Sequence, residues 1–336
     1  METDFGRNSN PQVSVIVLSY NHAATVSRAL DSVLAMREHC SALEIVVGDD
    51  GSTDGCYELC MEYARRFPDM VHVLPREPNM GVVRNYFRCL KACRGEFVTD
   101  CAADDCRLPG TWLVKQMTML KEDSNLVAVG SDWIECRNEQ DLYSRDKDCH
   151  ALWRRTVSGK EMLEGVLASV GSFPVPLSAM LYRRDAIDTD SLMVCNDAFG
   201  CEDLPLICAL GAKGDFGFVE EESLLYFVGT SSLSNTKVVD RLLHFYSKVL
   251  VCRLTLANHY NRHTKEVDAA IVHGAVFVAG LAFDSGNKQS VEMVTNVFSE
   301  FGLERKLSLL AQIKLRLTRH PWLWSAARGM KRLIGR

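Results

Sequence analysis

The first hundred residues alternate short apolar segments with amphipathic ones at close and regular spacing. The β-branched run Val13–Leu18 predicts a buried strand, and the apolar residues within 26–34 that follow it have helical spacing. The same two patterns, apolar runs and helical spacing, predict further strands at 43–47, 71–74 and 96–99 and further helices at 56–67 and 81–93. Strands and helices that alternate in this way are typical of βαβ units, so the pattern favours an α/β fold with a mostly parallel sheet.

The alternation loosens after residue 125, and the remaining elements are predicted one by one. Strands are expected at 126–130, 179–182, 216–219 and 224–228, a helix at 204–210, and helical periodicity alone from 238 onward. A chain of 336 residues with 47% apolar content can bury a large core and carry an appendage. The longest apolar run, 269–283, contains His273 and is shorter than the roughly 20 residues of a membrane-spanning helix, so we expect a buried helix there.

Charge and cysteine content narrow the class of protein further. The net charge of −5 argues against nucleic-acid binding as a property of the whole chain. Thirteen cysteines follow an N-terminus that is polar and has no apolar signal segment. This combination favours reduced thiols and a cytoplasmic location.

Two pairs of carboxylates follow predicted strands, Asp49–Asp50 after the second and Asp104–Asp105 after the fourth. The carboxyl ends of neighbouring strands are where open α/β sheets bind ligands. Asp and Gly at strand ends are also common in ordinary turns, so either pair alone would be weak evidence. Residues 50–55 resemble the start of a calcium-binding EF-hand loop, but Met61 stands where that loop needs a bidentate glutamate. Glycine-rich dinucleotide and phosphate-loop motifs are absent from the sequence.

Several motifs together resemble the nucleotide-sugar glycosyltransferases of family two, an inverting family with the GT-A fold. The matching motifs, within residues 12–230, are Val13–Asn21, Val47–Asp54, Asn79–Asn85, Arg94–Val98, Asp104–Asp105 with Leu108–Pro109, and Glu202–Asp203. The resemblance implies a Rossmann-like, mostly parallel sheet flanked by helices, and the helical periodicity from 238 onward predicts a C-terminal helical extension.

The resemblance and the patterns outside it together predict a division of the chain. A flexible N-terminus is expected at 1–11, a GT-A domain at 12–232, and a C-terminal helical region with a basic amphipathic tail at 233–336. Within the GT-A domain, residues 12–110 are expected to bind the nucleotide sugar and 111–232 the acceptor.

Roles follow from the positions that match the family. The nucleotide sugar is expected to contact Ser19, Tyr20, Asp50, Arg84 and Asp104, and a divalent metal, Mn²⁺ or Mg²⁺, to contact Asp105 and Asp104. Tyr20 would stack near a uracil-type base, Asp50 would accept a hydrogen bond from that base, and Arg84 would lie near the diphosphate. Asp203 is expected to be the general base, with Glu202 orienting the loop or holding the acceptor.

Two departures from the family pattern weaken parts of this interpretation. The metal loop of the family often has an acid where this chain has Ala102, which makes metal dependence less secure. A Tyr-Arg-x-His element commonly follows the base motif, and the matching stretch here, Tyr226–Gly229, lacks both the Arg and the His.

The last 32 residues are strongly basic. From Arg305 onward there are nine Lys or Arg and no acid, so the first 304 residues carry a net charge of −14. Apolar residues at helical spacing accompany this charge: Leu307, Leu310, Ile313 and Leu317, followed by Trp322 and Trp324. A basic amphipathic segment with tryptophan is typical of peripheral membrane contact, although a solvated helix packed on its own domain has the same pattern.

The resulting hypothesis is an inverting hexosyl- or N-acetylhexosaminyltransferase that uses a UDP-sugar. Its acceptor would be a saccharide, in the synthesis of a bacterial surface polysaccharide such as lipopolysaccharide. If the tail contacts the cytoplasmic face of the inner membrane, this saccharide would be linked to a lipid. Two alternatives stay open: a catalytically degenerate, transferase-like scaffold and a sugar nucleotidyltransferase. The second would need a glycine-rich phosphate loop after the first strand, where residues 19–22 supply none.

Overall fold

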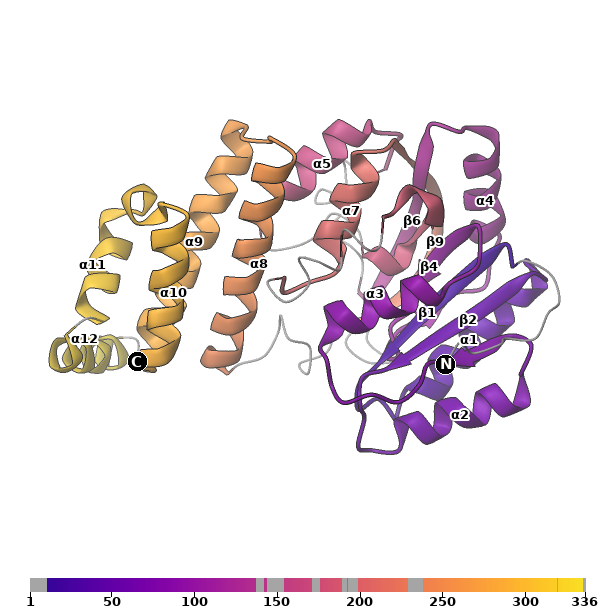
Figure 1. The fold of residues 1–336 in the computed structure, drawn as a ribbon, viewed down its shortest axis with the longest axis horizontal. Coiled ribbons are helices and arrows are strands. Elements are labelled where there is room, and N and C mark those ends of the chain that lie inside the picture. Colours follow the sequence, from indigo (N-terminus) through magenta and orange to yellow (C-terminus); the bar gives the residue numbers. More distant parts are fainter. Residues whose placement is uncertain are drawn as a thin grey trace. The chain divides into compact units, whose positions relative to one another are not determined.

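The computed structural model describes residues 11–136, 142–143, 154–170, 176–188, 192, 199–228, 238–318 and 320–334 (Figure 1). The chain forms two compact units. Unit 1 comprises residues 1–163, 173–197 and 205–228, and unit 2 comprises 164–172, 198–204 and 229–336. The predicted flexible N-terminus lies outside the described residues except for Pro11, and so does the predicted domain boundary at 232.

The first half of unit 1 is the expected series of βαβ units. Strands β1 (Val13–Ser19), β2 (Leu43–Asp49), β3 (Val71–Val73) and β4 (Phe97–Asp100) are joined by helices α1 (Val26–Ala35), α2 (Cys56–Arg66) and α3 (Val82–Ala92). The four strands are parallel and lie in the order β3-β2-β1-β4. The α/β prediction is therefore confirmed, with strand and helix bounds close to those expected.

The sheet continues beyond β4 with mixed strand directions. The added strands are β5 (Cys106–Arg107), β6 (Leu126–Cys136), β7 (Leu142–Tyr143), β8 (Met180–Arg183) and β9 (Asp215–Phe227), in the order β4-β8-β6-β9-β5 with β7 on β6. Strand β8 is antiparallel to both of its neighbours, while β6 and β9 are parallel. Three helices lie between these strands in the chain: α4 (Trp112–Glu122), α5 (Gly159–Ala168) and α7 (Asp203–Gly211). The parallel arrangement thus holds for β1 to β4 and for β6 with β9.

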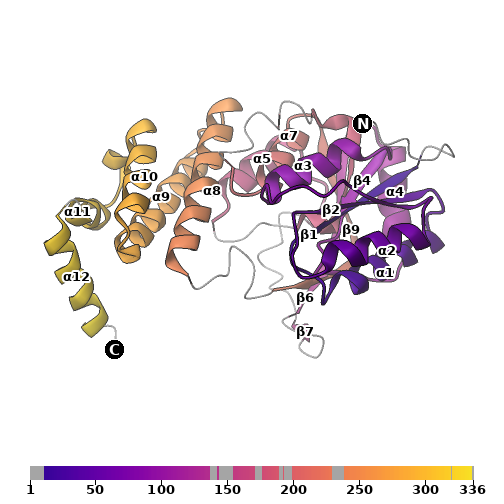
Figure 2. The same cartoon turned by 60° about the horizontal axis from the view of Figure 1, so that its bottom comes forward.

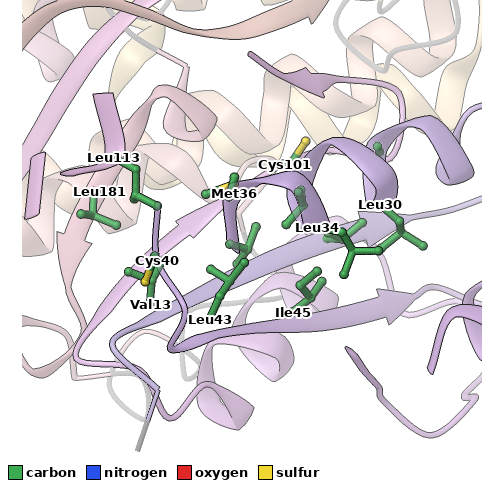
Figure 3. Packing of buried hydrophobic residues seen from close by; sticks show 14 of the residues in the cluster. Val13, Leu30, Leu34, Met36, Cys40, Leu43, Ile45, Cys101, Leu113 and Leu181 are labelled. Carbon is green, nitrogen blue, oxygen red and sulfur yellow. The ribbon is translucent and has the colours of Figure 1, made fainter. Parts of the chain in front are cut away.

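Helix α1 covers one face of the parallel strands. Its apolar positions Val26, Leu30, Val33 and Leu34 are all buried. They belong to one hydrophobic cluster with the strand residues Val13, Leu43 and Ile45. Figure 3 shows Leu30 and Leu34 of the helix close to Ile45 of β2 in this cluster. This packing holds β1 and β2 in place beneath α1, and the ends of these strands carry the candidate site.

Unit 2 is mainly helical. It contains α8 (Val239–His259), α9 (Lys265–Ser285), α10 (Lys288–Glu300), α11 (Leu309–Thr318) and α12 (Pro321–Ile334) (Figure 2). Helix α9 packs against α8, α10 and α11. Its first turn is capped by Thr264, whose hydroxyl accepts from the Val267 N–H, and it ends at Gly286 in the left-handed conformation.

The apolar helix predicted around 269–283 is α9. Within the described residues it is the one helix that is long and apolar enough to cross a membrane, and 44% of its apolar window is buried. Its buried face includes Val267, Ile271 and Phe283. The prediction of a buried helix is therefore correct for one face of α9.

The described cysteines are mostly buried, and their redox state stays a prediction. All eleven cysteines among the described residues are free, and all but Cys106 are buried. The described residues also contain no cluster of three or more His, Cys, Asp or Glu side chains that could hold a metal ion by itself.

Candidate active site

The strands that carry the two acidic pairs end at the same edge of the sheet. Ser19 at the end of β1 lies opposite Asp49 at the end of β2. On the other side of β1, Asp100 at the end of β4 lies opposite Ile16. The chain after β4 then continues alongside β1, because the Ala103 N–H donates to the carbonyl of Leu18 (3.0 Å). Residues 104 and 105 therefore lie near the end of β1, on the side of that strand opposite the loop that begins at Asp49.

Asp49 organises the loop after β2. Its Oδ1 accepts from the Ser52 N–H (2.9 Å), and its Oδ2 accepts from the hydroxyls of Ser19 (3.1 Å) and Ser52. All three side chains are buried. The predicted nucleotide contact of Ser19 stays a prediction, and in this structure its hydroxyl has an internal partner.

Asn21 ties the loop after β1 to the loop after β2. It adopts a left-handed backbone conformation with φ of 57°. Its N–H donates to the Ser52 hydroxyl (2.8 Å), and its side-chain oxygen accepts from the Thr53 N–H (2.9 Å). Tyr20, immediately before it, is 49% exposed. The ring of Tyr20 is therefore available for stacking, as its predicted role requires.

Asp50 holds a third loop in place. Its Oδ1 accepts from the Met80 N–H (2.8 Å) and its Oδ2 from the Gly81 N–H (3.0 Å). Gly51 allows this close approach, since its φ is 77° and a Cβ there would lie 2.8 Å from the Asn79 nitrogen. Burial raises the pKa of Asp50, and the two N–H groups counteract part of this effect. Each carboxylate oxygen keeps one acceptor position for a ligand, so the predicted contact with a base stays open.

The loop that Asp50 holds leads into α3, which carries Arg84. The Arg84 side chain is exposed in the first turn of the helix. One residue later, Asn85 is buried and its amide donates to the Gly48 carbonyl (2.7 Å) of β2. Asn85 thereby fixes the position of α3, and of Arg84, relative to the ends of the strands.

Asp104 and Asp105 have different surroundings. Asp104 is partly exposed, whereas Asp105 is 1% exposed. The Oδ1 of Asp105 accepts from the Phe227 N–H (2.9 Å), and its buried Oδ2 has no protein hydrogen-bond partner among the described residues. Burial raises the pKa of Asp105 well above its usual range, and the neighbouring Asp104 raises it further. An ionised Asp105 therefore requires positive charge nearby.

One cation beside this loop was not anticipated from the sequence. The guanidinium of Arg28, in α1, donates to the main-chain carbonyl of Asp104 (2.7 Å) and lies over the Phe227 ring, 4.2 Å from its centroid. Phe227 stands where the Tyr-Arg-x-His element has its arginine. The structure thus brings a guanidinium to the acidic loop from a helix 76 residues away in the chain.

A second arginine lies beneath the loop. Arg107 is 3% exposed and donates to the Thr99 hydroxyl and the Asp100 carbonyl. Burial lowers its pKa, while the nearby Asp100 and Asp105 carboxyls raise it. Its guanidinium also lies 4.9 Å from the centre of the Trp112 ring. Arg107 is therefore a buried counter-charge for the acidic loop.

The residues at this edge fit a divalent cation that takes most of its ligands from the substrate. Two adjacent carboxylates are available, and Asp105 has a buried oxygen with no protein hydrogen-bond partner among the described residues. Mg²⁺ commonly binds one or two protein carboxylates and completes its coordination with phosphates and water. The loop could hold such an ion with a bound diphosphate.

Glu202 and Asp203 belong to unit 2. Asp203 is the first residue of α7, which confirms the predicted helix start, and its Oδ1 accepts from the Leu204 N–H (2.8 Å). Desolvation raises the pKa of Asp203, against the lowering effects of the Cys201 thiol, the main chain and the Arg253 charge. Glu202 is partly exposed.

Comparison with known proteins relates this arrangement to one family. The family model described as glycosyl transferase family 2 matches residues 14–189. The uncharacterised protein Rv1520 of Mycobacterium tuberculosis is 34% identical over 108 residues, which are 32% of this chain and 31% of the relative. The putative glycosyltransferase EpsE of Bacillus subtilis is 28% identical over 37% of this chain and 44% of its own length. The uncharacterised glycosyltransferase alr2836 of Nostoc is 29% identical over 53% of this chain and 52% of its own. The chain thus matches about a third to a half of the length of these relatives.

Solved structures agree on the fold. The crystal structure of TarS residues 1–349 from S. aureus in complex with UDP-GlcNAc has a TM-score of 0.51 at 15% identity, over 95% of this chain and 92% of that one. The mannosyltransferase PcManGT from Pyrobaculum calidifontis, in complex with GDP-Man and Mn²⁺, has a TM-score of 0.51 at 16% identity, over 95% and 87%. These likenesses show the fold of a GT-A transferase with helices after the sheet.

Proposed function

This chain belongs to glycosyltransferase family 2, and we propose that it is an inverting enzyme with a UDP-sugar donor and a saccharide acceptor. The observation that carries the proposal is the shared sheet edge, where the loop after β2 and the acidic loop after β4 lie on either side of the end of β1. A nucleoside diphosphate presents a flat base, hydroxyls and negative charge. The exposed Tyr20 ring, the two acidic pairs and the arginines offer complementary groups for all three.

The donor would be bound by residues of three loops. Tyr20 would stack on the base, Asp50 would accept from it, and Asp104 would contact the ribose or the cation. Arg28 and Arg84 would face the diphosphate, for which a guanidinium is well shaped. The complexes of TarS with UDP-GlcNAc and of PcManGT with GDP-Man support a nucleotide-sugar donor in this fold.

A divalent cation, Mn²⁺ or Mg²⁺, would be held by Asp104 and Asp105. When bound, it would neutralise charge that develops on the departing diphosphate. The chain's own contribution is to place the two carboxylates, through the Ala103 contact with β1 and the Phe227 N–H on Asp105. Arg107 would counter their charge from below.

The displacement itself would depend on Asp203. Its carboxylate would take the proton of the acceptor hydroxyl while that oxygen bonds to the anomeric carbon, and the bond from this carbon to the diphosphate would break on the opposite face. Because its pKa is raised, the ionised carboxylate of Asp203 is a stronger base than that of an ordinary aspartate. At any pH above this raised pKa the side chain is mostly ionised and can accept the proton. Glu202 would orient this loop or hold the acceptor.

The acceptor would be a lipid-linked saccharide presented at the cytoplasmic face of the inner membrane, in the synthesis of a surface polysaccharide such as lipopolysaccharide. Residues 111–232 would bind the saccharide, and residues 305–336 would make peripheral contact with the membrane. The absence of acids from that last segment supports this part of the proposal.

Donor turnover tests the proposal. A panel of nucleotide sugars is incubated with the protein, Mn²⁺ and saccharide acceptors, and released nucleoside diphosphate and glycosylated product are measured by mass spectrometry. Asp203→Asn should reduce product formation about 10²- to 10⁴-fold, whereas Asp185→Asn, an exposed acid in unit 1, should not.

Full activity in Asp203→Asn would refute the assigned general base. Donor binding by the wild-type protein without turnover would favour the scaffold alternative. Release of pyrophosphate in place of nucleoside diphosphate would indicate a nucleotidyltransferase.

A further inference from the structure

Helix α9 leaves an apolar face uncovered within unit 2. Its residues Ala269, Val272 and Val276 recur at helical spacing and are partly or fully exposed. Phe277 borders them and is 43% exposed, with its ring edge-on to that of Tyr246 in α8 (5.0 Å between centroids). This is the same helix whose opposite face forms part of the unit 2 core. Exposure of an apolar stripe on the most apolar long helix indicates an interaction site.

An open pocket of about 560 Å³ lies along this stripe. It is lined by Lys265, Asp268, Ala269, Val272, His273, Val276 and Ser308. Three of these residues are apolar, and all three lie on α9. Ser308 immediately precedes α11. The pocket is therefore lined by apolar residues of α9 together with polar residues of α9 and Ser308.

Helix α11 continues the apolar surface from the pocket. Leu309 and Leu310 follow Ser308 directly and are 73% and 64% exposed, and Ile313 is 44% exposed. The stripe expected from the sequence is wrong in one respect, because Leu307 is buried and packs inside the unit. The exposed side of α11 is thus formed by leucines that the unit 2 core does not use.

The two tryptophans of the tail differ in the same way. Trp324 is buried, and its indole N–H donates to the Phe283 carbonyl of α9 (2.8 Å). Trp322, two residues earlier, is 73% exposed. One tryptophan therefore anchors α12 to α9, while the other is exposed.

The charges around this surface are mainly positive. Arg305, Lys306 and Arg316 are exposed, and Lys314 lies near the Phe283 ring, 6.0 Å from its centroid. The acids on the same elements include Glu266 and Asp268 in α9 and Glu304 just before Arg305, and the Oδ1 of Asp268 lies 3.1 Å from the Nδ1 of His263. Because a symmetric contact with a second copy would bring two such basic patches together, an anionic partner is the better electrostatic match.

We propose that the α9–α11 surface, formed by Ala269, Val272, Val276, Phe277, Leu309, Leu310 and Ile313, docks on a membrane that contains anionic lipids. The leucines of α11 and Trp322 enter the interfacial region, the α9 pocket accepts acyl-chain segments, and the arginines and lysines meet the lipid phosphates. This proposal deepens the peripheral contact described above and rests on it. It moves the contact from the tail alone to a surface shared with α9.

Vesicle co-sedimentation with the full-length protein tests the proposal. Vesicles of phosphatidylcholine alone are compared with vesicles of phosphatidylcholine that contain about 30% phosphatidylglycerol, at low and high salt. The wild-type protein should bind the anionic vesicles and lose binding as salt rises. The double variant Leu309→Ser/Leu310→Ser should bind them at least about tenfold more weakly. Its matched control is Val114→Ser/Val170→Ser, which changes exposed valines elsewhere.

Charge is tested with a second matched pair. Arg305→Glu/Arg316→Glu should weaken binding at low salt, whereas Lys213→Glu/Arg241→Glu makes the same change in net charge at exposed positions elsewhere and should weaken it much less. Circular dichroism confirms that each variant is folded. Equal binding by the leucine variant and its control would overturn the proposal.

Two further readouts separate the competing outcomes. A dimer of the wild-type protein in light scattering that is lost in Leu309→Ser/Leu310→Ser would identify a second copy as the occupant and overturn the membrane proposal. Nucleoside-diphosphate release with a soluble acceptor is measured without vesicles. A protein that turns over donor but does not bind anionic vesicles refutes the docking surface and leaves the transferase proposal intact.

Discussion

Asp203, the proposed general base, has a raised pKa that lowers the stability of the folded chain when its carboxyl is ionised. Its folded-state pKa is raised by desolvation, so the folded chain binds the proton more tightly than the unfolded chain does. The wild-type protein therefore loses stability as pH rises from the unfolded pKa, near 3.8, to the raised folded value. Above that window the full cost of desolvating the ionised carboxyl is present.

The variant Asp203→Asn is expected to separate the two effects. Because asparagine does not titrate, the variant's free energy of unfolding, relative to that of the wild-type protein, should rise as pH increases through this window and then level off. Denaturant unfolding at several pH values between about 4.5 and 8 measures this difference, in parallel with the turnover assay. A stability difference that does not change with pH would show that the carboxyl is not desolvated in the folded chain.

Arg28 is the second residue with a specific expected role. Removing its charge in Arg28→Met should raise the KM for the donor about tenfold, because a hydrogen bond to a charged group contributes about 1.5–3 kcal/mol. Arg28→Lys should restore part of the loss. Arg37→Met, at an exposed position after α1, is the matched control. A fall in kcat alone, with unchanged KM and unchanged product inhibition by UDP, would contradict a role in donor binding.

The sequence could identify the acidic pairs but not this arginine. Asp50 and Asp104–Asp105 follow apolar strands within recognisable motifs, which local pattern and family resemblance both detect. Arg28 lies in an amphipathic helix, where an arginine is ordinarily a solvated surface residue. Its contact with the Asp104 carbonyl spans 76 residues and depends on the packing of α1 beside the loop after β4. Local sequence pattern carries no signal for such a contact.

At the scale of elements, the loops at the sheet edge depend on one another. Asn21 supplies an acceptor for the Thr53 N–H and holds a left-handed conformation that most residues avoid. Asn21→Ala should therefore destabilise the protein by about 2 kcal/mol, from the lost hydrogen bond and the backbone strain together. Asn21→Gly should cost about 1 kcal/mol, because glycine adopts the same conformation without strain.

Urea denaturation of the two Asn21 variants measures these costs, and the donor KM reports whether the loops still align. Equal destabilisation by alanine and glycine would mean that backbone strain contributes nothing and that the hydrogen bond alone holds the loops. No loss in either variant would mean that the loop after β2 keeps its position without Asn21.

The elements themselves show where pattern reading succeeds. Strands β1 to β4 were predicted within one or two residues because buried parallel strands are continuous apolar runs with helices between them. The predicted strands at 216–219 and 224–228 are instead one strand, β9. The acidic residues 220–222 look like a turn, but the register with β6 shifts there and leaves Glu220 and Glu221 as a bulge. Glu221 then accepts from the Thr111 N–H and pairs with Lys115. The contacts that stabilise this bulge are long-range, so the sequence alone does not reveal them.

At the scale of the whole molecule, two units each have a core of their own. Unit 1 is centred on the sheet and unit 2 on helices α8 to α10. Periodicity predicted the helical C-terminal region but not which faces are buried, because α9 and α11 are apolar on more than one side. This ambiguity explains why Leu307 and Leu310 were expected on one stripe although Leu307 is buried and Leu310 is exposed.

A matched pair of cavity variants tests this division into two cores. Phe87 in α3 of unit 1 and Phe298 in α10 of unit 2 are both fully buried. Replacing either with alanine should cost about 3–5 kcal/mol, because buried apolar contacts are lost and a cavity remains. Since opening follows cooperative units, Phe298→Ala should speed amide exchange in α8, α9 and α10, and Phe87→Ala should speed it in β1 and β2. Hydrogen-exchange mass spectrometry under native conditions reads both units in one experiment. If each variant accelerates exchange equally in both sets of elements, the chain opens as a single cooperative body, and the two cores do not act as separate sources of stability.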